Sequence, residues 1–199
     1  RADEKIFQLL RSILQNYPRT TLLFSGAHIF DDLNPIWSHY LINVRTLKIG
    51  HLSENDAREL IVKPIDDFPV RYSQSAVDEI LATTACQPYL IQATCRDLVN
   101  MLNEQNRKNA DEKDAKFALD SVLTSGSAYF KEVWSGPDRS NTQRDFLFLI
   151  AKKAGKTVSE DDARKKCTVS DLRFLTQYEI LEKTPSGYRF KVELVRRWV

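Results

Sequence analysis

The sequence predicts a mainly α-helical fold that opens with the end of an α/β domain and closes with a winged helix-turn-helix. Apolar residues recur at helical spacing through most of residues 51–134. Before residue 50, two short and almost uniformly apolar segments are typical of strands buried in a parallel sheet. Residues 139–199 combine helical patterns with a hairpin turn signal. We therefore expect three domains, over 1–50, 51–134 and 139–199.

Composition excludes several classes of protein. The 199 residues are 42% hydrophobic and 28% charged, which is ordinary for a globular protein. There is no run of about 18 apolar residues and no signal-peptide pattern, so we expect a cytoplasmic protein with no membrane span. The three cysteines form no C-x-x-C motif and the three histidines lack ligand spacing, so no metal site is expected.

The first expected domain looks incomplete. An amphipathic helix over 3–16 is followed by strand candidates at 20–26 and 46–49, with a short helix over 31–42 between them. Two parallel strands do not form a stable sheet alone. The chain also starts at Arg1 without a methionine, so we expect a larger α/β region to precede it. Otherwise, the unpaired strands would be able to recruit a protein partner or a second copy.

The second expected domain is a set of helices with clear start signals. Ser53 and Ser73 are natural N-caps for helices that end at Lys63-Pro64 and at residue 84. Pro88 fits the first position of a long helix over 88–107, since proline there loses no intrahelical hydrogen bond. Two further helices are expected over 111–123 and around 129–134.

The third expected domain is small and basic. Ser135-Gly136-Pro137-Asp138 marks its boundary, because glycine and proline together interrupt a helix. Helices are expected over 143–154 and 158–167, with a third capped by Thr168 or Ser170, and strands at 180–183 and 187–192 flank a turn. Residues 139–199 carry 14 basic and 8 acidic side chains, against 15 and 19 in residues 1–138.

Together these pieces resemble the C-terminal half of a STAND/AAA+ type P-loop ATPase. Thr21 to Gly26 is similar to the strand that carries the sensor-1 residue, and Leu52 to Ile61 to the opening of the helical lid. Cys86-Gln87-Pro88-Tyr89-Leu90-Ile91-Gln92 resembles the family's G-x-P-Y-L-x-Q segment, with Cys86 in place of the usual glycine.

The resemblance implies roles for four residues. Ser25 would sense the γ-phosphate, and Arg45 would act as an arginine finger. Pro88 and Tyr89 would lie against the nucleotide base. The alternatives are a strand-end hydroxyl, a solvated charge, and a helix start with Tyr89 packed in the lid. ATP and magnesium belong to the intact parent, because no G-x-x-x-x-G-K-[ST] motif occurs here. The chain alone is expected to be inactive.

The basic third domain suggests a second kind of function. Arg164, Lys165 and Lys166 lead into the expected recognition helix, which would expose Ser170, Arg173 and Gln177, while Arg189 and Lys191 lie on the wing. Such groups beside a helix that fits the major groove predict DNA binding. Five nearby carboxylates oppose it. The first hypothesis is a nucleotide-dependent switch in signalling; the alternative is a DNA-binding module or protein-interaction scaffold without a nucleotide role.

Overall fold

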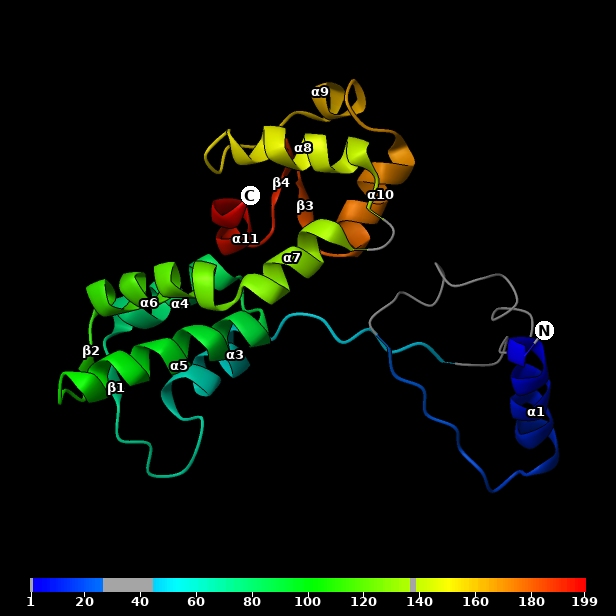
Figure 1. The fold of residues 1–199 in the computed structure, drawn as a ribbon, viewed down its shortest axis with the longest axis horizontal. Coiled ribbons are helices and arrows are strands. Elements are labelled where there is room, and N and C mark those ends of the chain that lie inside the picture. The colour runs from blue at the N-terminus through cyan, green and yellow to red at the C-terminus, as the bar shows by residue number, and fades with distance from the viewer. Residues whose placement is uncertain (1, 27–44, 137–138) are drawn as a thin grey trace. The chain divides into compact units, whose positions relative to one another are not determined.

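The computed structural model describes residues 2–26, 45–136 and 139–199, so the predicted helix over 31–42 lies outside the described residues. The chain divides into two compact units, residues 1–49 and 50–199 (Figure 1). Each unit is described by itself below.

The first unit contains one described helix, α1 (Ala2–Asn16), which confirms the predicted helix over 3–16. The predicted strands at 20–26 and 46–49 are wrong as strands, because both segments have irregular structure. Their apolar side chains are exposed: Leu23 is 89% exposed and Ile49 is 96% exposed. A parallel strand needs a neighbour for its backbone hydrogen bonds, and the described residues supply none.

The second unit starts with helices that follow the predicted order. They are α3 (Glu54–Val62), α4 (Gln74–Thr84), α5 (Pro88–Glu104), α6 (Glu112–Ser125) and α7 (Ser127–Ser135). The Ser53 and Ser73 hydroxyls accept hydrogen bonds from the amides of Asp56 and Ala76, as expected for N-caps. Two-residue strands, β1 (Arg71–Tyr72) and β2 (Asn109–Ala110), pair in parallel and tie the segment before α4 to the segment before α6.

The last sixty residues form three helices and a hairpin in the predicted order. They comprise α8 (Asn141–Ala151), α9 (Glu160–Arg164), α10 (Val169–Gln177), β3 (Leu181–Thr184) and β4 (Gly187–Phe190). Thr168, not Ser170, caps α10. The expected helix over 158–167 is shorter, because Val158 exchanges two backbone hydrogen bonds with Tyr188 and extends the hairpin sheet. A final helix, α11 (Glu193–Trp198), was not predicted, and the expected strand 187–192 ends at Phe190.

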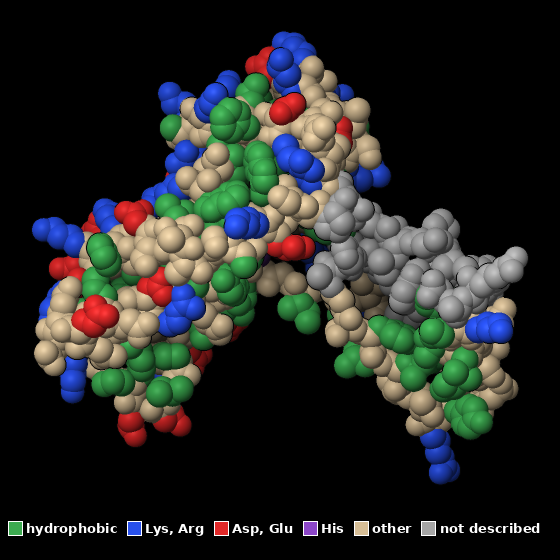
Figure 2. Space-filling view, viewed as in Figure 1, with side chains coloured by type: hydrophobic (Ala, Val, Ile, Leu, Met, Phe, Trp, Pro, Cys, Tyr) green, Lys and Arg blue, Asp and Glu red, His purple; other side chains and the backbone are tan. Residues whose placement is uncertain are grey.

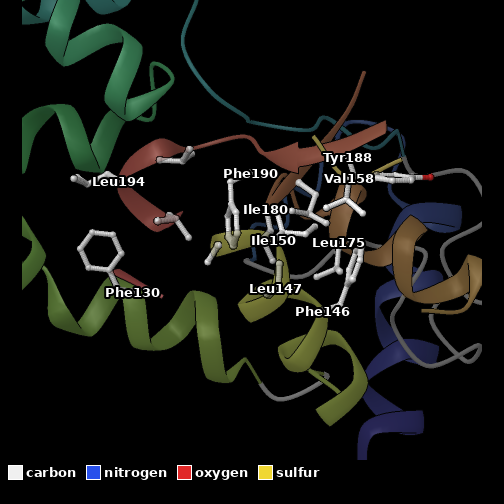
Figure 3. Close-up of a cluster of buried hydrophobic side chains, with 14 of the residues drawn as sticks. Phe130, Phe146, Leu147, Ile150, Val158, Leu175, Ile180, Tyr188, Phe190 and Leu194 are labelled. Atoms are coloured by element: carbon white, nitrogen blue, oxygen red, sulfur yellow. The ribbon is translucent and has the colours of Figure 1, made fainter. Parts of the chain in front are cut away.

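Two apolar cores hold this second unit together. One lies among α3, α4, α5 and α6 and includes Ile61, Ile80, Leu98 and Leu102. The other joins α5, α6 and α7 to the C-terminal elements and includes Leu90, Phe130, Phe146 and Leu194 (Figure 3). Residues 51–134 and 139–199 therefore pack around a common core.

Candidate functional site

The loop between α4 and α5 has an unusual backbone. Ala85 and Cys86 both adopt left-handed conformations, with φ of 49° and 60°. Glycine reaches this region without the steric cost that a side chain imposes, which explains why glycine would suit the position of Cys86. Cys86 nevertheless takes the conformation, and Gln87 then enters extended backbone before Pro88.

Pro88 occupies the first turn of α5, as predicted. The Gln87 side chain caps the helix, since its Oε1 accepts a hydrogen bond of 2.8 Å from the Leu90 amide. The next side chain, Tyr89, is 42% exposed and stacks on Tyr129, with ring centroids 5.0 Å apart. Burial raises the pKa of Tyr129 to about 12, so this phenol stays neutral. The site therefore presents a proline and an accessible tyrosine face side by side.

The residues that open the second unit are bound to this loop. The Leu52 amide donates to the Cys86 carbonyl at 3.0 Å, and His51 Nδ1 lies 2.6 Å from the Ala85 carbonyl. Because a carbonyl only accepts, Nδ1 must carry the hydrogen. The loop is thus hydrogen-bonded to the residues that follow the first unit in sequence.

The other ring nitrogen of His51 faces the C-terminal elements. His51 Nε2 lies 3.8 Å from Glu179 Oε2, and Lys191 Nζ lies 2.8 Å from Glu179 Oε1. Glu179 sits between α10 and β3 with a φ of 58°. A Cβ added at Gly50 would lie only 3.3 Å from the Glu179 carboxylate, so glycine leaves room for this contact. One histidine therefore touches both the Pro88 loop and the hairpin base.

The sequence analysis did not predict this arrangement. The structure brings His51 to the Ala85 carbonyl, and no spacing in the sequence joins these two residues. Glu179, Gln87 and Tyr129 were not singled out as site residues either. The contacts of His51 with Ala85 and Glu179, and of Tyr89 with Tyr129, join segments more than thirty residues apart, which no local spacing rule encodes.

Two of the predicted site residues, Ser25 and Arg45, belong to the first unit. Ser25 and Arg45 are both exposed and lie in irregular segments. Their proposed catalytic roles stay predictions. Among the described residues there is no group of three or more His, Cys, Asp or Glu that could hold a metal ion. The thiol of Cys86 is partly buried, and this burial raises its pKa.

Half of the predicted nucleic-acid residues form ion pairs within the protein. Arg164 pairs with Glu160 at 2.6 Å, Lys165 with Asp162 at 2.8 Å, Arg189 with Glu182, and Lys191 with Glu179. The exposed members without such a pair are Lys166, Ser170 and Arg173, while Gln177 is half-buried. The structure thus leaves two predicted cations, Lys166 and Arg173, available on this surface.

Comparison with known proteins gives a likeness of fold. No protein-family model matches the sequence, and no curated protein matches it. A solved point variant of RuvB from Thermotoga maritima matches with 14% identity and a TM-score of 0.50, covering 93% of this chain and 62% of the RuvB chain. A second RuvB variant matches over the same shares at 14% identity with a TM-score of 0.49.

A third structure, described as the Thermotoga maritima RuvB Holliday junction branch migration motor, covers 71% of this chain and 47% of its own at 14% identity, with a TM-score of 0.38. This chain spans less than two thirds of the first RuvB chain, and its mostly helical fold is similar to the matched part of that structure. None of the described helices is both long and apolar enough to cross a membrane.

Proposed function

We propose that these residues are the C-terminal portion of a STAND/AAA+ like ATP-binding protein and act as its nucleotide-dependent switch. In this proposal residues 51–134 are the lid and 139–199 a winged helix. ATP and magnesium bind the intact protein, whose P-loop lies in a region N-terminal to Arg1. Ser25 and Arg45 read the phosphates, and Pro88 and Tyr89 contact the base.

The observation that carries the proposal is the double contact of His51. A base that pressed on Pro88 and Tyr89 would push the loop whose Ala85 carbonyl His51 holds. The same ring faces Glu179, which anchors Lys191 at the end of the hairpin. A shift of the loop would therefore alter a contact of the C-terminal module directly.

A second route leads through the core. Leu90 directly follows Tyr89, is fully buried, and belongs to the core shared by the lid and the C-terminal elements. Aromatic rings also contact one another in series from the exposed Tyr89 through Tyr129 and the buried Phe130 to Trp198, with centroid distances of 5.0, 5.4 and 5.7 Å. The first and last pairs are stacked, and the middle pair meets edge to face. Close-packed groups transmit displacement because they leave no free volume to absorb it.

The exposed apolar residues of the first unit support an α/β neighbour. Leu23, Leu47 and Ile49 are 89%, 68% and 96% exposed. In the proposal, the α/β region N-terminal to Arg1 covers these side chains. The sequence has no P-loop of its own, so the 199 residues alone should release no phosphate from ATP above a buffer control.

The test compares ATP-magnesium affinity in the intact protein for the natural sequence, Tyr89→Ala and Phe117→Ala. Phe117 is a matched control, because it is an exposed aromatic residue on α6 that lies outside the loop. We expect Tyr89→Ala to weaken binding about tenfold, the loss of roughly one aromatic stacking contact, and Phe117→Ala to leave it unchanged. Equal affinity in all three would refute the base contact.

Transmission is tested separately through His51→Ala. Hydrogen exchange of α11 amides is measured with and without ATP-magnesium. We expect nucleotide to change this exchange in the natural protein, and the change to shrink in His51→Ala while ATP affinity is kept. If the natural protein shows no nucleotide effect on α11, the switch is wrong even when ATP binds.

A further inference from the structure

The turn between α8 and α9 carries three lysines that no carboxylate neutralises. Lys152, Lys153 and Lys156 are exposed, and none of them forms an ion pair with another residue in the described ranges. Lys152 Nζ lies 4.1 Å above the ring of Phe148, which is itself 47% exposed. Lys153 stands near enough to Asp162 to help lower the pKa of that carboxyl, but Asp162 bonds to Lys165.

The backbone fixes these lysines in a tight turn. Ala154 and Gly155 are both left-handed, with φ of 50° and 82°. The Lys156 amide donates to the Lys153 carbonyl at 3.1 Å, which closes the turn. A side chain at the C-terminal end of a helix is favoured when it is cationic, and this accounts for Lys152 and Lys153. This effect of the helix end does not account for Lys156, which lies farther from Ala151, the last residue of α8.

Lys156 instead lines a cleft of about 160 Å³ between this turn, the hairpin and α11. Four basic residues line it, and its two acidic residues, Glu182 and Glu193, are already bound to Arg189 and Arg196. Lys191 is paired with Glu179, so Lys156 is the lining cation that forms no ion pair within the described residues. Lys and Arg side chains gather around the end of α8 in Figure 2.

This surface contrasts with the one predicted for nucleic acid. There, Arg164 and Lys165 are held by Glu160 and Asp162. An ion-paired cation must give up its partner before it can bind a phosphate. None of the three turn lysines has to break an ion pair within the described residues, although Lys152 contacts the Phe148 ring. Lysines beside an accessible aromatic ring are a combination that binds a phosphate backbone and stacks a base.

We propose that Lys152, Lys153 and Lys156, with Phe148, form a contact surface for the phosphate backbone of nucleic acid. Backbone binding by lysine releases counterions and is independent of sequence. The site lies at the turn after α8 and not on α10, so it is distinct from major-groove reading by a recognition helix. Binding at this surface requires no ATP. The proposal does not depend on the nucleotide-dependent switch.

The experiment measures fluorescence anisotropy of a labelled single-stranded oligonucleotide and of its duplex with the 199-residue chain, without ATP, between about 50 and 200 mM salt. Two triple variants are compared. One is Lys152→Gln with Lys153→Gln and Lys156→Gln. The other is Lys165→Gln with Lys166→Gln and Arg173→Gln. Both remove three positive charges, so they differ in position and not in net charge. Thermal melts check that both variants fold.

We expect the turn variant to weaken binding at least tenfold at low salt and to reduce the slope of log affinity against log salt by about two to three. The α10 variant should change the affinity less than threefold. A single strand should bind better than its duplex if Phe148 stacks a base, and Phe148→Ala should then abolish the preference. Binding lost only in the α10 variant, weakened equally in both, or absent from the natural chain would each overturn the proposal.

Discussion

The two units of this protein contrast in how they treat apolar side chains. In residues 50–199, large apolar residues such as Phe130, Leu98 and Ile80 are fully buried in two cores. In the described part of residues 1–49, Phe7 is the buried hydrophobic residue, while Leu9, Leu23, Leu47 and Ile49 are more than half exposed. Both units have apolar patterns in sequence. A capped helix satisfies its backbone hydrogen bonds within its own segment, whereas an extended segment needs partner strands for them.

The largest expected effect on stability comes from a substitution in the core that α5, α6 and α7 share with the C-terminal elements. Phe130→Ala removes a fully buried ring that stacks on Trp198, with centroids 5.7 Å apart. We expect it to lower the free energy of unfolding by about 3 to 5 kcal/mol, because burial is lost and a cavity is left. Urea unfolding followed by circular dichroism measures it.

Phe117→Ala is the control for that experiment, since Phe117 is 62% exposed and should change stability by less than about 0.5 kcal/mol. One unfolding transition is expected for residues 50–199, because residues 51–134 and the C-terminal elements share a core. Two separate transitions, of which Phe130→Ala shifts only one, would mean that residues 51–134 and the C-terminal elements are independently stable.

A smaller effect is expected from the ion pair that secures α6. Arg107 donates to both oxygens of Asp114 at 2.9 and 2.7 Å, and Asp114 also caps the helix through the Asp111 amide at 3.0 Å. The hydrogen bonds from Arg107 hold the pKa of the Asp114 carboxyl below its ordinary value. Asp114→Asn should destabilise the protein by about 1 kcal/mol at pH 7, with Arg107 partly solvated.

The pH dependence of this difference has a definite sign. A lowered folded-state pKa gives stability that is present above the unfolded pKa and is lost as pH falls through the folded value. The gap between the natural protein and Asp114→Asn should therefore be constant near neutrality and close below about pH 4. Urea midpoints from pH 7 to pH 2.5 measure it. A gap that widens on acidification would contradict the assigned pKa direction.

The smallest effect is expected from removing the first unit. Deletion of residues 1–49 should change the melting temperature of residues 50–199 by less than about 3 °C, since the core residues of the second unit all lie beyond residue 50. Differential scanning calorimetry measures it. A fall of 10 °C or more would show that the exposed apolar residues of the first unit contribute to folding of the second.

Local signals predicted much of the second unit. Serine N-caps located α3 and α4, Pro88 located the start of α5, and the Pro-Ser turn located the hairpin. The predicted strands at 20–26 and 46–49 failed for the opposite reason. A uniformly apolar segment indicates burial, but whether it becomes a strand depends on a neighbour that these local patterns do not supply.

The candidate site was only half predictable. Pro88 stood out because proline at a helix start has a local cause. Tyr89 stood out only because its segment resembles a family motif. His51 and Glu179 did not, because they meet only when the chain before α3 and the turn after α10 converge. Similarly, counting charge marked residues 139–199 as basic, yet it did not reveal which cations pair internally and which remain accessible.

The sequence by itself determined where helices begin, which faces they bury, and that the final third is basic, because caps, periodicity and composition act within a few residues. Tertiary structure alone decided that residues 51–134 and the C-terminal elements share a core and that His51 lies against both the Pro88 loop and Glu179. It also decided that the lysines after α8 form no ion pair within the part of the chain that the structure describes. Those outcomes depend on distances between segments far apart in the chain, and such distances exist only after folding.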